Sequence, residues 1–156
     1  MSVVPSGTSD EVISITWTTG GTGTVYLTAG DNDATGLNGI SLDAQITTVD
    51  GDVLLSSADD IVQTALITTT SGDVGLIATD LISQSATGDI TTTSGDVLVD
   101  AGGDWTMNAD ATITAGGQDV LGQAGGTITL GVISLTNATA NRVALSAGGS
   151  ILDANA

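Results

Sequence analysis

Ser71-Gly72-Asp73-Val74 returns as Ser94-Gly95-Asp96-Val97, 23 residues further along the chain. A related copy, Asp50-Gly51-Asp52-Val53, lies 21 residues before the first. Self-similarity at a fixed period of about 20 to 50 residues is typical of solenoids and other repeat architectures. The spacing therefore predicts a stack of short repeats, which we call rungs.

Three apolar columns follow this period. The first holds Val53, Val74, Val97, Val120 and Val143. The second holds Ile40, Ile61, Ile82, Trp105, Ile128 and Ile151. The third holds Ile46, Ile67, Ile90 and Ile113, and its register shifts near Ile133. Apolar residues alternate with others at period two within each segment, as strands require. We therefore predict an all-β fold, a parallel β-helix with three short strands in each rung of 21–23 residues; a β-sandwich has no reason to keep three columns in step.

The two ends of the pattern differ. Residues 1–22 fit no column, so we expect them to form an N-terminal capping segment over the open end of the stack. Residues 23–156 hold about five to six rungs. The first rung is longer than the others, which places a loop insertion at residues 29–38.

The composition excludes several functions. The formal net charge is −17, and Arg142 is the only Lys or Arg. Such a chain repels phosphate backbones and anionic lipid heads, so we expect no nucleic-acid binding and no membrane insertion. There is no Cys and no His, so thiolate or imidazole metal sites and the usual nucleophile–base pairs cannot form. We expect no enzymatic activity.

One column is acidic. It contains Asp52, Asp73, Asp96 and Asp119, and Arg142 ends it. Carboxylates about 5 Å apart repel by about 1 kcal/mol in water and about 3 kcal/mol at an effective dielectric of 20. Hydrogen bonds from the backbone of each turn would offset this repulsion. We also expect a charge-assisted pair between Arg142 and Asp119, which the period places on the adjoining rung.

Calcium is the one cofactor that the sequence suggests. Asp31, Asn32 and Asp33 concentrate oxygen ligands in the inserted loop, although the bidentate Glu of a calcium loop does not follow them. The alternative is a polar surface loop. Calcium between the carboxylates of the acidic column is a further possibility, but one Asp per rung supplies few of the six to eight oxygens that the ion takes.

Threonines offer a candidate binding face. Thr47, Thr68, Thr91 and Thr114 should point outward, and Thr70 and Thr93 join them in two rungs. A flat array of this kind resembles the ice-binding face of β-helical antifreeze proteins, which makes an ice- or carbohydrate-binding module the alternative function. Stacked Thr residues are also common because they suit strands and hydrogen-bond across rungs.

A more distant alternative is an Asp-based glycosidase. Asp59 and Asp60 lie beside Asp80 on the next rung, and paired carboxylates hydrolyse glycosides in some β-helix enzymes. Trp105 and Met107 take the places of aliphatic residues, so we interpret both as packing residues.

From residue 37 onward the sequence resembles the repeat regions of very large bacterial surface exoproteins, the filamentous-haemagglutinin-like adhesins. Three segments carry the resemblance: Gly51-Asp52-Val53-Leu54-Leu55-Ser56, Gly88-Asp89-Ile90-Thr91-Thr92-Thr93 and Leu145-Ser146-Ala147-Gly148-Gly149-Ser150-Ile151. It implies a right-handed β-helix that serves outside the cell as a stalk or adhesin scaffold. No signal peptide is visible at the N-terminus, so we expect a piece of a longer protein. Neighbouring copies could stack end to end; the adhesive ligand is left open.

Overall fold

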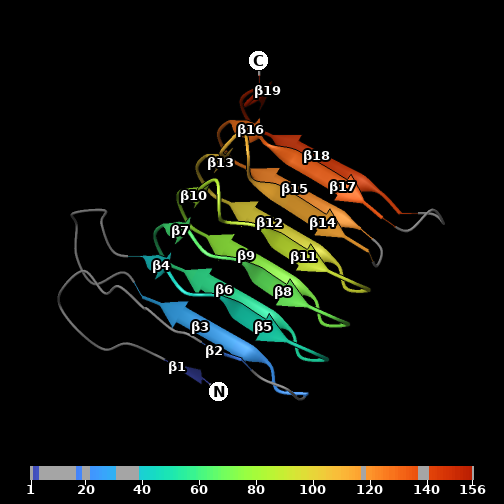
Figure 1. Cartoon of the computed structure of the whole chain (residues 1–156). Coiled ribbons are helices and arrows are strands. Elements are labelled where there is room, and N and C mark those ends of the chain that lie inside the picture. The colour runs from blue at the N-terminus through green and yellow to red at the C-terminus, as the bar shows by residue number, and fades with distance from the viewer. Residues whose placement is uncertain are drawn as a thin grey trace.

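Parallel strands build the whole of the described structure. The computed structural model describes residues 2–3, 17–18, 22–30, 39–116, 119–136 and 141–155. These residues form strands and turns and contain no helix, and the rungs stack from the N-terminal to the C-terminal end (Figure 1). In this part of the chain, no helix has the length and apolar character that a membrane crossing requires. The predicted all-β, parallel β-helical fold is confirmed.

The strands form three sheets. Sheet A has seven strands: β1 (Ser2–Val3), β3 (Val25–Ala29), β6 (Val53–Ser57), β9 (Val74–Ala78), β12 (Val97–Ala101), β15 (Val120–Ala124) and β18 (Val143–Ala147). Sheet B has six: β2 (Trp17–Thr18), β5 (Ile46–Thr48), β8 (Ile67–Thr69), β11 (Ile90–Thr92), β14 (Thr112–Ala115) and β17 (Val132–Leu135). Sheet C has six: β4 (Ile40–Leu42), β7 (Ile61–Gln63), β10 (Ile82–Gln84), β13 (Trp105–Met107), β16 (Ile128–Leu130) and β19 (Ile151–Asp153).

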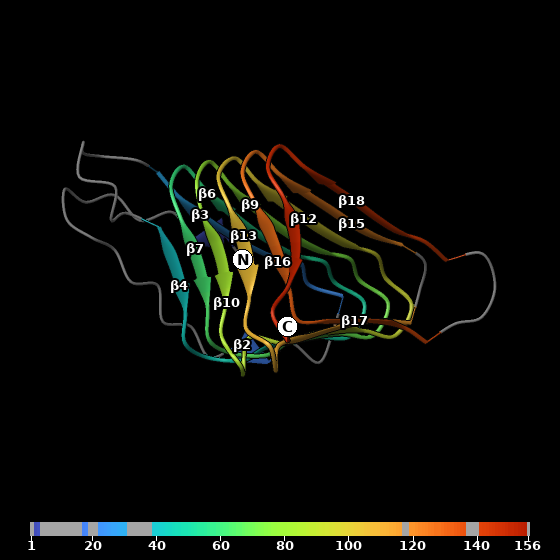
Figure 2. The ribbon, with the colours of Figure 1, turned by 90° about the horizontal axis from the view of Figure 1, so that it is seen from above.

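Each rung passes through sheets A, C and B in that order, and the next rung pairs with it in parallel. Seen from above, the three sheets form the walls of the stack (Figure 2). The register puts equivalent residues side by side, because Val53 pairs with Val74 and Ile61 with Ile82. The shift predicted in the third column is present: Ile113 pairs with Ile133 rather than with Thr136. The sequence columns are therefore the physical ladders of the solenoid.

The core lies between the three sheets. Burial alternates along the strands from β3 to β15, so that β6 and β9 both show every second side chain buried. Ile61, Ile67 and Ile82 are completely buried. Because a β-branched side chain packs well on a pleated surface, stacks of Val and Ile fill this narrow interior without the help of Phe.

Two predicted segments fall largely outside the described residues. Within residues 1–22, β1 extends sheet A by pairing with β3, and β2 extends sheet B by pairing with β5; the capping role of the remainder stays a prediction. The connection from β3 to β4 spans residues 30–39, whereas the equivalent connection from β6 to β7 spans 58–60. Asp31, Asn32 and Asp33 lie in that connection, outside the described residues.

Candidate functional site

The corner between sheets B and A repeats one motif, Thr-x-x-Gly-Asp-Val, at residues 48–53, 69–74 and 92–97. The Thr of each copy is buried. Its hydroxyl donates a hydrogen bond to the carbonyl of the Gly three residues on: Thr48 to Gly51, Thr69 to Gly72 and Thr92 to Gly95, at 2.5, 2.5 and 2.6 Å. These inward threonines were not singled out from the sequence, although the recurring Thr-x-x-Gly spacing is a signal that reveals them.

The Asp of the same motif links consecutive rungs. Oδ1 of Asp52 accepts the backbone N–H of Asp73 at 2.9 Å, and Oδ1 of Asp73 accepts the N–H of Asp96 at 2.8 Å. Oδ1 of Asp96 accepts the N–H of Asp119 at 2.9 Å. In return, the backbone carbonyl of Asp73 accepts the N–H of Val53 at 2.8 Å. A carboxylate thus replaces a backbone carbonyl as the acceptor where the chain turns.

This geometry corrects one expectation from the sequence. We expected each Asp to accept hydrogen bonds from its own turn, but the donor belongs to the following rung. The reason is the position of the Asp immediately before a strand. Its side chain points toward the next rung and accepts a backbone N–H there, which meets no other acceptor among the described residues. The carboxylates therefore cross-link the stack.

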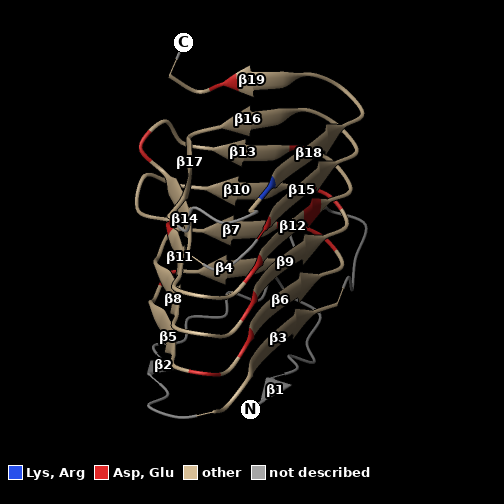
Figure 3. Ribbon diagram, turned by 90° about the vertical axis from the view of Figure 1, so that its right-hand side faces the viewer, with Lys and Arg blue, Asp and Glu red and all other residues tan. Residues whose placement is uncertain are grey.

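Arg142 ends the acidic ladder, which we define as Asp52, Asp73, Asp96 and Asp119. The expected pair is present: Nε and Nη2 of Arg142 donate to Oδ2 of Asp119 at 3.2 and 2.6 Å. The hydrogen bond from Arg142 holds the pKa of Asp119 below its usual range. Oδ1 of Asp119 accepts the N–H of Arg142 at 2.9 Å. Figure 3 shows the acidic segments aligned from rung to rung beside sheet A, with the basic segment above them.

The same bond occurs at the other two corners. Oδ1 of Asp60 accepts the N–H of Leu81 at 2.9 Å, and Oδ1 of Asp104 accepts that of Thr127 at 2.6 Å. At the corner before sheet B, Oδ1 of Asp89 accepts the N–H of Thr112 at 2.7 Å. Much of the negative charge therefore has a structural origin, because an Asp before a strand satisfies a backbone donor of the next rung.

The outward threonines form a single column on sheet B. The register aligns Thr47, Thr68, Thr91 and Thr114, and Ser134 continues them. All of these side chains are partly exposed. Thr70 and Thr93 are exposed but lie beyond the ends of β8 and β11. The expected two-column face is therefore one hydroxyl column with two threonines in the adjoining turns.

Asp59, Asp60 and Asp80 come together at the corner between sheets A and C. One carboxylate oxygen of each lies within 4.8 Å of the others. Asp59 is buried, Asp60 is half-buried and Asp80 is exposed. Burial raises the pKa of Asp60, and the like charges of Asp59 and Asp80 add to this effect, whereas the hydrogen bond from Leu81 opposes it. The three carboxylates that the glycosidase hypothesis names are therefore brought together at one corner.

The raised pKa of Asp60 predicts that Asp60→Asn stabilises the protein at pH 7. Because the pKa in the folded state exceeds the ordinary value of 3.8, the stability linked to Asp60 is complete below that value and is lost as the pH rises through the folded pKa. The amide keeps an oxygen for the N–H of Leu81. We expect a gain below about 1 kcal/mol, since solvent screens partly exposed charges.

Thermal unfolding from pH 3 to pH 7 measures this effect. The gain from Asp60→Asn should vanish at the acid end, where the native carboxyl is protonated in both states. Asp89→Asn removes an equal charge and keeps the same kind of inter-rung hydrogen bond at the corner before sheet B, so it serves as the matched control. A gain from Asp60→Asn that is the same at every pH would contradict the electrostatic explanation.

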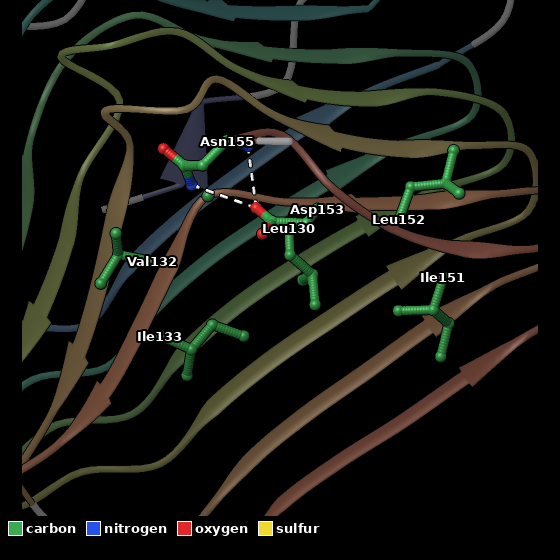
Figure 4. Close-up of a pocket in the computed structure, with 8 residues that line it drawn as sticks. Leu130, Val132, Ile133, Ile151, Leu152, Asp153 and Asn155 are labelled. Carbon is green, nitrogen blue, oxygen red and sulfur yellow. Dashed lines mark hydrogen bonds between the residues drawn. The ribbon is translucent and has the colours of Figure 1, made fainter.

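The C-terminal end of the stack exposes core residues. Val143 and Ile151 are 43% and 49% exposed, whereas Val120 and Ile128, one rung below, are fully buried. Leu130, Val132, Ile133, Ile151 and Leu152 line a shallow hollow here, and Asp153 Oδ1 accepts hydrogen bonds from both nitrogens of Asn155 (Figure 4). In end-to-end stacking, a rung of a second copy would lie on β18. Its backbone N–H at the ladder position would then face Arg142, and a guanidinium cannot accept a hydrogen bond. Sedimentation velocity tests whether copies of the chain nevertheless stack in solution, as the sequence predicts.

A polar chain crosses the core, and it was missed from the sequence. Gln63 and Gln84 are buried; Gln84 Nε2 donates to Gln63 Oε1 at 3.1 Å, and the indole N–H of Trp105 donates to Gln84 Oε1 at 2.9 Å. Gln63 Nε2 in turn reaches the carbonyl of Asp89 at 2.9 Å. Trp105 is a packing residue as expected, but it also completes this hydrogen-bond chain.

Comparison with known proteins identifies the domain type. The family model of Toastrack DUF4097 matches residues 13–129, which is most of the chain. A search of curated proteins and a search of solved structures both found no match.

Proposed function

The chain belongs to the Toastrack DUF4097 family, and on that premise we propose that it is a non-catalytic β-solenoid scaffold, a stalk or adhesin segment of an extracellular bacterial surface protein. The family and the fold support the repeat scaffold. The surface location and the adhesive role rest on the resemblance to giant repeat adhesins.

The observation that best supports the scaffold role is the set of hydrogen bonds that aspartate side chains make between rungs. Side-chain oxygens at all three corners accept backbone N–H groups of the following rung, at 2.6 to 2.9 Å. One oxygen of each of these carboxylates therefore serves to hold consecutive rungs together. The absence of His, Lys and Cys from the sequence also favours a role without chemistry.

Two experiments on cells test the surface location and the scaffold role. Antibodies against this chain should label intact cells of the organism that encodes it; labelling only after permeabilisation would contradict the surface location. Replacing the segment in its parent protein with an unrelated β-solenoid of equal length should preserve adhesion if it acts as a stalk. Loss of adhesion would indicate that the segment itself binds the target.

A hydrolysis assay with a panel of glycosides tests the non-catalytic role. The purified protein is compared with the variants Asp59→Asn and Asp80→Asn. Glycoside hydrolysis that is lost in both variants would overturn the non-catalytic role.

Calcium should have little effect on the scaffold. Asp59, Asp60 and Asp80 together offer three carboxylates within reach of one ion, while calcium takes six to eight oxygens. We therefore expect millimolar calcium at physiological ionic strength to raise the Tm by less than about 1 °C, because a ligand stabilises only in proportion to its occupancy of the folded state. Magnesium at the same ionic strength is the control. A larger shift that depends on Asp59 would show a calcium site.

A second candidate function is recognition of ice or carbohydrate through sheet B. The observation that favours it is the column of partly exposed hydroxyls on Thr47, Thr68, Thr91 and Thr114, repeated at each rung. Thermal hysteresis or glycan binding that is abolished by Thr68→Tyr and Thr91→Tyr would support this function. Absence of both activities in the unaltered protein would reject it.

A further inference from the structure

Sheet A differs from the other two sheets on its outer face. The outward column of sheet C contains Ser41, Val62, Ser83, Thr106, Thr129 and Leu152, and that of sheet B contains hydroxyls. On sheet A the register instead stacks Tyr26, Leu54, Gly75, Leu98, Leu121 and Ala144. Tyr26 and Leu121 are 38% and 41% exposed. We call this column the apolar stripe.

The acidic ladder borders the apolar stripe. Each ladder Asp lies two residues before a stripe position, as Asp96 does before Leu98, and side chains two apart in an extended chain point to the same face. Asp96 is exposed, and Leu98 is half-buried. A row of negative charges thus runs beside a row of aliphatic side chains, with both rows repeating at the rung spacing of about 4.8 Å.

The inter-rung bond uses only one oxygen of each ladder carboxylate. Oδ1 is committed to the N–H of the next rung. Oδ2 of Asp119 binds the guanidinium of Arg142, and no donor from the described residues reaches Oδ2 of Asp73 or Asp96. The pair with Arg142 shows that a guanidinium fits this position without disturbing the inter-rung bond.

We propose that the outer face of sheet A is a docking surface for a polypeptide segment that presents arginine side chains beside aliphatic ones. The guanidinium groups pair with Oδ2 of the ladder, and the aliphatic groups cover the apolar stripe. Charge complementarity selects such a partner over a second copy of this chain, whose net charge of −17 opposes docking of that copy on the acidic outer face of sheet A. The inference rests on the proposed scaffold role and adds a partner to it.

The test uses the whole chain and a fluorescent peptide of alternating Arg and Leu, with binding followed by anisotropy. We expect saturable binding that weakens at least about tenfold in Asp73→Asn/Asp96→Asn, because the double variant loses two charge-assisted pairs with the peptide. The amide retains the acceptor for the next rung. Leu98→Ser/Leu121→Ser should weaken binding to a similar extent.

The matched control is Asp89→Asn/Asp104→Asn, which removes the same charge and keeps the same kind of inter-rung bond at the other two corners. It should change the affinity less than about twofold, since these carboxylates lie outside the stripe. Equal weakening by both Asp pairs, unchanged binding in the Leu variant, or no binding at all would each overturn the proposal. None of these results affects the scaffold role, which the surface-labelling and replacement experiments test separately.

Discussion

Replacing Gly95 with Ala is expected to lower the free energy of unfolding by about 3 kcal/mol, a large loss for one methyl group. A Cβ at this position would lie 2.0 Å from the carbonyl oxygen of Gly72 and 2.6 Å from its carbonyl carbon. Both atoms are backbone of the rung below, so neither can rotate away. Gly51 and Gly72 meet the same obstacle, a carbonyl oxygen at 2.1 Å in each case.

Gly23 supplies the matched control, because it lies in the same column one rung below Gly51. Among the described residues, a Cβ on Gly23 would meet nothing within 4 Å. Gly23→Ala should therefore be neutral, or stabilise by up to about 1 kcal/mol through the unfolded chain. Urea unfolding of the two variants measures the difference. Similar losses in both would show that glycine is needed for its backbone conformation and that close stacking of the rungs is not the cause.

The repeat period alone predicts which residues lie in the same column of the stack. The sequence predicts which residues stack, because the steps of 21 and 23 residues that join Val53, Val74 and Val97 leave one parallel register in which all the columns align. It also predicts the pair of Arg142 and Asp119, which needs only the register. The residue that shifts the third column, Ile133, was found in the same way.

Other features depend on the direction in which a side chain points, and the repeat period does not determine that direction. Asp73 could accept hydrogen bonds from its own turn or from a neighbouring rung, and only the structure shows that the backbone N–H of Asp96 is the donor. Gln63 and Gln84 occupy inward positions that period two assigns to the core, yet polarity alone argues against burial. Their burial becomes understandable once Trp105 and the carbonyl of Asp89 are seen to complete the hydrogen bonds.

Trp105 and Gly122 form the second case of strong dependence between rungs. Trp105 stands in a column of Ile, and Gly122 in a column with Leu55, Leu76 and Leu145. A Cβ on Gly122 would lie 2.3 Å from Cζ3 of Trp105 and 2.7 Å from Cδ2 of Leu145. Gly122 therefore leaves the space that the indole of Trp105 fills. The Trp in the Ile column and the Gly in the Leu column explain each other.

We expect Gly122→Leu alone to destabilise the fold by about 3 kcal/mol or more through overpacking. Trp105→Ile alone should cost about 2–4 kcal/mol, because it leaves a cavity and removes the donor to Gln84 Oε1. The double variant restores Ile and Leu to their columns, and its cost should fall short of the sum by about 2 kcal/mol or more. What remains is the loss of the indole hydrogen bond.

Gly122→Ala keeps the measurement possible if the Leu variant does not fold, since its single methyl group meets the same ring atom. Urea unfolding of the wild type, both single variants and the double variant closes the cycle. Ile46→Val, in a core strand three rungs from Trp105, is the control, and its cost should add to that of Trp105→Ile without coupling. Additive costs for Trp105 and Gly122 would mean that the rungs adjust independently, and the indole would then owe its place to Gln84 alone.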